Sequence, residues 1–542
     1  MGAYIARVFA GERTLLSPVL VPVENAIYRV CRIEPETQMR WPAYLFAMLA
    51  FSASGIAALY VLLRVQQWLP LNPQHATNLS ADSAWNTAVS FATTCDWEAF
   101  TPETALSTFS QMAGLAWQNF AAAGVGLALA IAFVRGLTRS RDDRLGNFWV
   151  DLTRGIVYVL LPLAIVFGMA FVSQGVPQTL GGYVDVQNAE GAKQTLVLGP
   201  LASQEAISVL GGNGGGFVAA NVASPNENPA PLANALQIFE MLLIPAALTF
   251  TFGRMVRDAR QGWALFVAMM TIVVAGVAVG SWAESAGNPA IHALGAAGGN
   301  FEGKEVRFGA AGAGLSLAAG TDATTGQVNA ALDSMMPLSN LVALIDMQIG
   351  EVAFGGVGSG LYGMLVFVVL TVFIGGLMVG RTPEYLGKKI ERREVQYAML
   401  AVLLFPAAIL FPAALAVLLP AATSAVGNPG PHGFTEMLYA FVSTAASNGS
   451  AFGGLMANTL FYNLATGIAM LLGRYAVAIP TLALAGAVAA RPVNLKASQG
   501  AFSTATPLFV GLLLAVIVVV GALTFLPADL LGPVDEQLRL GM

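Results

Sequence analysis

The sequence predicts an all-α membrane protein with many spans, in which four units of span, short pore helix and span are joined in one chain with one or two extra spans. Charged residues make up only 11% of the 542 residues, hydrophobic residues make up 56%, and the mean hydropathy is +0.67. An average soluble domain carries about 25% charged residues. A surface this poor in charge suits a lipid bilayer. Apolar stretches of spanning length and a polar segment that recurs four times between them complete the prediction.

Nine stretches are long and apolar enough to cross the hydrocarbon core, which takes about 20 helical residues. The sixth and the eighth are too long for one straight crossing. Because the sixth contains the glycine-rich stretch 350–363, we expect a helix broken by a loop at membrane depth, which is tolerated where the backbone is buried in protein or lines a wet cavity. The predicted spans are about 42–64, 106–134, 148–172, 232–252, 263–283, 340–380, 396–420, 458–490 and 506–527.

Lysine and arginine predict the orientation of these spans. Basic clusters at 135–144, 254–260 and 381–393, and a smaller one of Arg491 with Lys496, alternate with polar loops that are poor in both residues. The positive-inside rule places such clusters in the cytoplasm, and the chain after Pro527 then lies outside. The predicted units are a cytoplasmic or interfacial segment 1–41, pore repeats 42–135, 148–253, 263–380 (with the broken second helix) and 396–490, and an extra span 506–527.

A short polar segment lies between the two spans of each repeat. These four filter segments are 93–97, 212–217, 324–329 and 447–452, and they follow predicted half-helices at about 83–92, 202–211, 312–322 and 435–446. One such segment alone is more often an ordinary turn or a site of small-residue helix packing. Four of them, in the same place of each repeat and about 110–125 residues apart, indicate a shared role.

The composition of the filter segments suits a dehydrated cation. A potassium ion crosses a membrane only where oxygens replace its water, and rings of backbone carbonyls do this in potassium filters. Glycine and asparagine tolerate the positive φ angles that turn carbonyls toward an axis. Threonine, serine and asparagine add side-chain oxygens. Four re-entrant segments around one axis would therefore form a potassium-selective pore from a single chain.

Three charged residues lie inside predicted spans. Two of them, Arg474 and Glu351, have two possible roles each, and the third, Glu240, has one expected role. Arg474 in the eighth span is either a pore-facing cation that repels potassium below the filter or an arginine that reaches to the interface. Glu351 is either an ion-path carboxylate or a cap of the second half of the broken helix. Glu240 is expected to be a structural acid with a partner. The charged run 381–394 is expected to be a solvated cytoplasmic loop that could also dock a partner.

The sequence also excludes classes of protein. It contains no G-x-x-x-x-G-K-[ST] loop and no large soluble segment, so we expect that the chain binds no nucleotide and does not hydrolyse ATP itself. The net charge of −5 gives no basic surface for nucleic acid.

Several long motifs resemble a known family, the potassium-binding A subunits of Kdp-type potassium-transporting ATPases. The resemblance runs from about residue 3 to the C-terminus. It rests on the stretches 199–207, 213–217, 227–229, 350–364, 380–389, 428–434 and 448–452.

The resemblance implies a relation to Trk/Ktr channels and a role that spacing does not show. Such a subunit selects K⁺ at the outer face of a bacterial inner membrane and passes it sideways to a P-type ATPase catalytic subunit, with small membrane accessory subunits completing the complex. By position, the implied K⁺ ligands are Thr94 and Cys95, Asn213 and Gly214, Thr325 and Gly326, and Asn448 and Gly449; the implied inner barrier consists of Gly355, Gly356, Gly358 and Arg474.

The sequence departs from the family pattern in two places. The family has a further N-terminal span, and Gly2 aligns just after the position where that span would end, which leaves nine spans instead of ten. The first filter segment carries Cys95, Asp96 and Glu98 in place of threonine, asparagine and glutamine. A thiol is a poor ligand for a hard cation, but the carbonyl of Cys95 would serve. Asp96 and Glu98 should add negative charge at the pore mouth, and Cys95 should react with small thiol reagents from outside.

Two other functions remain open from the sequence. One is a stand-alone channel or an ion-coupled potassium carrier of the Trk/Ktr type, for which flux through this chain alone would be diagnostic. The other is a structural or assembly protein, which predicts no bound ion.

Overall fold

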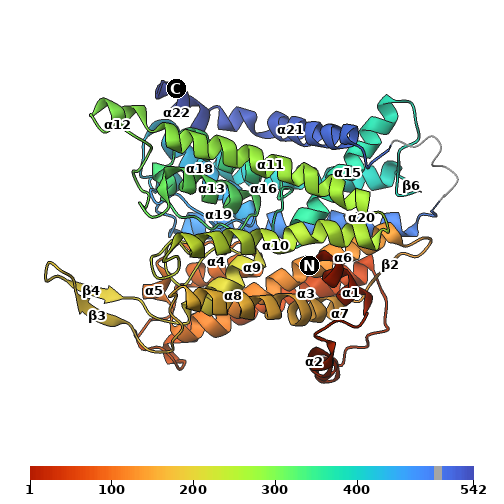
Figure 1. Cartoon of the computed structure of the whole chain (residues 1–542), viewed down its shortest axis with the longest axis horizontal. Coiled ribbons are helices and arrows are strands. Elements are labelled where there is room, and N and C mark those ends of the chain that lie inside the picture. Colours follow the sequence, from red (N-terminus) through yellow and green to blue (C-terminus); the bar gives the residue numbers. More distant parts are fainter. Residues whose placement is uncertain (494–502, 542) are drawn as a thin grey trace.

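The computed structural model describes residues 1–493 and 503–541, so Lys496 of the smallest basic cluster lies outside the described residues (Figure 1). Within the described residues, nine helical stretches are long and apolar enough to cross a membrane, as predicted. They are Trp41–Trp68 (α3 with η1), Ser110–Thr138 (η2 with α6), Phe148–Ser173 (α7, η3 and α8), Pro231–Met255 (α10), Ala259–Ala293 (α11 with α12), Ser359–Met378 (α15), Arg392–Leu418 (α16), Leu460–Ala490 (α19, η5 and α20) and Pro507–Asp529 (α21).

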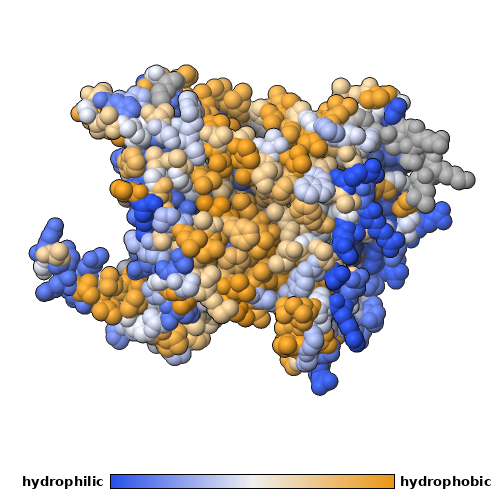
Figure 2. Space-filling model, viewed as in Figure 1, coloured by the Kyte–Doolittle hydropathy of each residue, from blue (hydrophilic) through white to orange (hydrophobic). Residues whose placement is uncertain are grey.

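The spans differ in how far protein surrounds them. In the most apolar window, 89% of Ser110–Thr138 and 72% of Ser359–Met378 is buried, against 22% for Trp41–Trp68 and for Pro507–Asp529. The second and sixth spans therefore form the centre of the bundle, while the first and last present most of their side chains to lipid. Figure 2 shows the resulting apolar band across the middle of the molecule, with polar residues toward both ends.

Four shorter helices stand where the half-helices were predicted. They are α4 (Ala81–Ala92), α9 (Leu201–Gly211), α13 (Gly309–Asp322) and α18 (Gly430–Ala445). The last begins five residues earlier than predicted, because Pro431 lies in its first turn, where a missing N–H costs nothing. Their C-terminal ends carry the partial negative charge of the helix dipole toward the filter segments.

The sixth predicted span is broken as expected. It divides into α14 (Pro337–Gln348) and α15 (Ser359–Met378). In the break, φ is positive at Gly350 (86°), Glu351 (59°), Phe354 (53°) and Gly358 (98°). These left-handed residues turn the chain in ways that a helix cannot follow. The eighth span, in contrast, stays continuous from Leu460 to Ala490 and takes up its extra length in the π-helical turn η5 (Leu472–Ala476).

The basic loops share one end of the helices, as the orientation rule requires. The buried Lys388 donates from Nζ to Gly136 O and Val488 O, both at 2.9 Å, and Arg491 forms ion pairs with Glu391 and Glu394. The two-residue and three-residue strands β1 (Met39–Arg40), β2 (Arg144–Gly146), β5 (Glu384–Tyr385) and β6 (Lys388–Lys389) belong to the loops of this end, whereas the hairpin of β3 (Val184–Gln187) and β4 (Lys193–Leu196) projects from the other (Figure 1).

Segment 1–41 contains two helices that the sequence did not predict, α1 (Gly2–Ala10) and α2 (Ser17–Cys31). The carboxylate of Glu24 fixes α2 to the third span: it accepts hydrogen bonds from Tyr158 Oη (2.7 Å) and Tyr28 Oη (2.6 Å) and an ion-paired one from Arg154 Nε (2.8 Å). The remaining short helices are α5 (Pro102–Ala105), η4 (Leu332–Ser334), α17 (Pro420–Thr423) and α22 (Pro533–Arg539).

Candidate ion-conduction site

The four filter segments meet at one place. A methyl group on the Cα of Gly214 would lie 2.7 Å from Asn448 O, 2.8 Å from Thr325 O and 3.2 Å from Cys95 O. Carbonyl oxygens from the first, third and fourth segments thus surround a glycine of the second. The space that the missing side chain leaves is lined by oxygens, which is the ligand type that replaces potassium's water.

Contacts between neighbouring segments give their order around the axis. A methyl on Gly326 would fall on Asn448 O, one on Gly449 would fall on Cys95 O, and one on Gly215 would lie 3.1 Å from Asp96 Cβ. The third segment therefore adjoins the fourth, the fourth adjoins the first, and the first adjoins the second. Asn221 closes the ring, because its Nδ2 donates to Gly326 O at 3.1 Å. Sequence reasoning did not single out Asn221, which is four residues past its filter segment and carries no pattern of its own.

One backbone hydrogen bond recurs in all four segments and identifies equivalent positions. The N–H of Cys95, Asn213, Thr325 and Asn448 each donates to the carbonyl five residues earlier, at 3.0, 3.0, 3.0 and 2.9 Å. The residues that follow are Asp96, Gly214, Gly326 and Gly449. The pair equivalent to Asn213 and Gly214 is accordingly Cys95 and Asp96, and Thr94 is equivalent to Gly212, Thr324 and Ser447. The pairing of Thr94 with Cys95 implied by the resemblance is one residue out of register.

The first segment adopts the filter backbone without glycine. Thr94 has φ of 62°, close to that of the equivalent Ser447 (55°). Asp96 has φ of 52°, close to that of the equivalent Gly326 (67°). Positive φ is costly for residues with a Cβ, so the surrounding contacts must hold these two residues in place. This conformation explains how a glycine-free sequence occupies a position where the other segments carry glycine.

The asparagine side chains of the filter brace it from behind. Asn448 Nδ2 donates to the carbonyl oxygen of Gly320, in the last turn of α13, at 3.1 Å. Asn213 Nδ2 donates to Asn119 O at 3.4 Å. Asn448 Oδ1 accepts from Ser450 N at 3.1 Å. These amides therefore hydrogen-bond to neighbouring backbone groups.

The thiol of Cys95 is buried, which contradicts the prediction that reagents reach it from outside. The residue is 0% exposed, and its Sγ lies 3.9 Å from Ser443 O of α18. The physical reason is that the carbonyl of Cys95 faces Gly214, so the side chain projects to the opposite side and packs among apolar residues behind the filter.

The two acidic residues of the first segment have different surroundings. Glu98 lines a cavity of about 670 Å³ together with Asn221, Asn329 and Gly449, and its role at a pore mouth stays a prediction. Burial and the nearby carboxylates of Glu103 and Glu227 raise the pKa of Glu98. Asp96 is 1% exposed and does not line this cavity, so the prediction that it adds charge at the mouth is wrong. We call the cavity the outer vestibule.

The loop between α14 and α15 lies directly below two of the filter segments. Gly356 N donates to Thr324 Oγ1 at 3.0 Å, and a methyl on Gly212 would lie 3.2 Å from Gly356 Cα and 3.1 Å from Val357 N. Methyl groups on Gly355 and Gly358 would overlap backbone atoms of Glu351 and Gly126. This glycine-rich loop packs too closely for side chains against the second and third segments.

Arg474 lies beside this loop, since a methyl on Gly126 would meet both Val357 O and Arg474 Nη2. Its π-helical turn contacts two pore helices: Tyr475 Oη donates to Ala92 O of α4 at 3.1 Å, and a methyl on Gly473 would fall on Ala445 O of α18. The guanidinium is in the interior, since Arg474 is only 5% exposed and its Nη2 would lie 3.1 Å from a methyl on Gly126. The interfacial reading of Arg474 is therefore wrong.

Two other charged residues are also settled by their positions. Glu351 lies inside the break and does not cap α15, whose N-cap is Gly358; it lines a small cavity of about 60 Å³ that also borders Gly350, Ser359 and Gly473. Glu240 is fully buried, and both of its carboxylate oxygens lack a hydrogen-bond partner among the described residues, so the expected partner is absent there.

Comparison with known proteins decides the family. The profile described as "Potassium-transporting ATPase A subunit" (KdpA) matches residues 1–538. The chain belongs to the KdpA family. A potassium-transporting ATPase potassium-binding subunit of Solibacter usitatus is 54% identical over 537 residues, which cover 99% of this chain and 94% of that protein. One of Mesorhizobium japonicum is 53% identical over 540 residues, covering 100% of this chain and 95% of that protein.

The relatives and a solved structure agree with the predictions on family and fold. KdpA relatives carry the name of the potassium-binding subunit rather than of a catalytic one, in agreement with a non-hydrolytic subunit. The potassium transporter TrkH from Vibrio parahaemolyticus has a similar fold, with a TM-score of 0.53, 15% sequence identity and coverage of 88% of this chain and 95% of that one. With nine spans and this family, the chain is a multi-pass membrane protein for potassium transport.

Proposed function

We propose that this chain selects K⁺ from the outer solution and delivers it to a P-type ATPase catalytic subunit for ATP-driven import across the bacterial inner membrane. One observation carries the proposal: Cys95 O, Thr325 O and Asn448 O surround the empty side-chain position of Gly214. Oxygens from separate repeats, each following the negative end of a pore helix, supply what a dehydrated cation needs.

The residues divide into three roles in this proposal. The carbonyls of Cys95, Asn213, Thr325 and Asn448 hold the ion, and Gly214, Gly326 and Gly449 let the segments approach closely. Glu98 attracts cations into the outer vestibule. The 355–358 loop and Arg474, which are neighbours at Gly126, block free passage below the filter. The four pore repeats, 42–135, 148–253, 263–380 and 396–490, each contribute one filter segment.

The inner block distinguishes a pump subunit from an open channel. An ion that has passed the filter meets a cation and a close-packed backbone, so onward movement requires another route, which a partner would provide. We propose that the catalytic subunit docks beside this level and that small accessory subunits complete the complex.

We expect that the chain, purified in complex with its P-type ATPase partner, makes ATP hydrolysis depend on K⁺ and not on Na⁺, because the carbonyl ring favours the larger, more weakly hydrated ion. The measurement is ATPase rate against each cation at constant ionic strength. Equal stimulation by Na⁺ would contradict the selective filter, whereas rapid K⁺ flux through the chain alone in vesicles would favour a stand-alone channel.

A further inference from the structure

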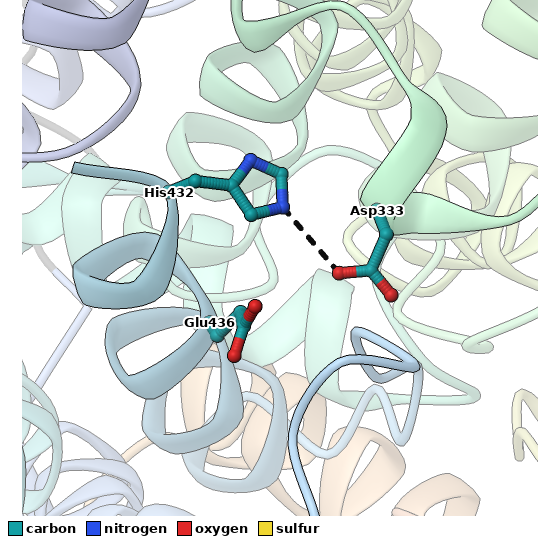
Figure 3. Close-up of side chains that lie close together, drawn as sticks. All are labelled: Asp333, His432 and Glu436. Carbon is teal, nitrogen blue, oxygen red and sulfur yellow. Dashed lines mark hydrogen bonds and ion pairs between the residues drawn. The ribbon is translucent and has the colours of Figure 1, made fainter. Parts of the chain in front are cut away.

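Three side chains converge beside the outer vestibule, away from the ion path. Asp333 belongs to η4, which follows the third filter segment, and His432 and Glu436 lie one turn apart on α18 (Figure 3). One ligand atom of each residue lies within 4.8 Å of the others. The i, i+4 spacing on α18 places the imidazole and the carboxylate on one helix face, toward Asp333.

The cluster carries more negative than positive charge. Besides Asp333 and Glu436, the carboxylate of Glu536 from α22 joins it, with Oε1 2.9 Å from His432 Nδ1. Among the described residues, no lysine or arginine forms an ion pair with any of these three carboxylates. Glu436 is 0% exposed, and a buried carboxylate without a counterion is costly. Even a protonated His432 leaves a net excess of two negative charges, which a divalent cation would offset.

Neighbouring groups already orient the three side chains. The hydrogen bond between Glu536 and Nδ1 of His432 orients the imidazole so that its Nε2 faces Asp333 Oδ1, 3.4 Å away. Asp333 Oδ2 accepts from Gly454 N at 2.7 Å, and Glu436 Oε1 accepts from Asn428 Nδ2 at 2.6 Å. A carboxylate on the far nitrogen of a ligating histidine, with hydrogen bonds to the ligating carboxylates, is the usual outer shell of a metal site.

The cluster is also accessible from the outer solution. Asp333 lines the outer vestibule, along with Gly453 and Leu332. An ion could therefore enter from the vestibule, and a water molecule from the same side could complete four-fold coordination.

We propose that Asp333, His432 and Glu436 form a binding site for a divalent transition-metal ion of the Zn²⁺ type. One imidazole nitrogen and two carboxylate oxygens suit Zn²⁺, whereas Mg²⁺ and Ca²⁺ prefer sites made of oxygens alone. The site joins the third repeat to the fourth at the rim of the outer vestibule, and Glu536 extends it to the C-terminal helix α22.

The test is calorimetric titration of the metal-stripped full-length protein with Zn²⁺ alone, in the absence of K⁺. We expect one saturable site that excess Mg²⁺ or Ca²⁺ does not displace. Asp333→Asn and His432→Ala should each weaken the Zn²⁺ affinity at least about 10-fold, and Glu536→Gln should weaken it about 10-fold through its effect on the histidine.

A matched control is His292→Ala, because His292 is exposed on the short helix α12 and contacts Gly298 O rather than a carboxylate. This variant should bind Zn²⁺ like the parent protein. The partly exposed Asp333 makes Asp333→Asn the variant least prone to misfold. Absence of a Zn²⁺ site in the parent protein, or a Zn²⁺ affinity of Asp333→Asn and His432→Ala that equals that of the parent protein, would overturn the proposal whatever the protein's potassium activity.

Discussion

Replacement of Gly214 by aspartate is expected to abolish high-affinity potassium binding. The first added carbon would lie within 2.7–3.2 Å of Asn448 O, Thr325 O and Cys95 O, so the carbonyls must move apart and the carboxylate would occupy the ion's place. Overpacking of this kind costs about 1–3 kcal/mol, equivalent to roughly a 5- to 150-fold loss of affinity before the displaced ion is counted. The measurement is the K⁺ concentration for half-maximal ATPase activity of the assembled complex.

Gly511→Ala is the control for a glycine replacement in this chain. Gly511 lies in α21, and a methyl group there would meet nothing within 4 Å, so the K⁺ dependence should not change. Gly214→Ala should fall between the parent protein and Gly214→Asp. If Gly214→Asp retained the parental K⁺ dependence and selectivity, the carbonyl ring would not be the binding site.

Replacement of Arg474 by glutamine is expected to let K⁺ leak through the protein. Arg474 is buried below the pore helices, and among the described residues it forms no ion pair with a carboxylate within 4.0 Å. Glu351 interacts with it only at longer range, so we expect the guanidinium to repel a cation below the filter. At an effective dielectric constant of about 20, like unit charges about 8 Å apart repel by about 2 kcal/mol. Loss of the charge should raise K⁺ occupancy below the filter about 30-fold. The measurement is passive ⁸⁶Rb⁺ flux in vesicles that contain the assembled complex without ATP.

Arg260→Gln is the matched control for this substitution. Its side chain is 81% exposed at the start of α11 and takes no part in the proposed pore. Passive flux should therefore stay at the parental level. If passive ⁸⁶Rb⁺ flux through Arg474→Gln stayed at the parental level, the loop at 355–358 would block the pore without help from the arginine.

The sequence predicted most of the fold because lipid imposes simple rules. Span lengths, basic loops and glycine-rich breaks each follow from one physical requirement, so the nine spans and all four pore helices lie close to their predicted positions. The helices α1 and α2 escaped prediction because they depend on a tertiary contact: Glu24 of α2 binds Tyr158 and Arg154, which are more than a hundred residues away.

Details of the ion site were harder to predict than its existence. The register of the first filter segment could not be read from glycine positions, because Thr94 and Asp96 take the positive φ angles there. The burial of Cys95 depends on which way the segment turns its carbonyl, and that carbonyl packs against Gly214 of the second segment and Gly449 of the fourth. The proposed metal site joins His432 and Glu436, four residues apart on α18, to Asp333 and Glu536, which are about a hundred positions away and which no local pattern connects to them.

The most direct test of the account is to locate a bound ion. Crystals or frozen grids of the assembled complex prepared in Tl⁺ or Rb⁺, which substitute for K⁺ and scatter strongly, should show density on the axis between the carbonyl oxygens of Cys95, Asn213, Thr325 and Asn448. The density should disappear in Gly214→Asp. Ion density that instead lay at the acidic side chains of Asp96 or Glu98, with none among these carbonyls, would contradict the carbonyl filter.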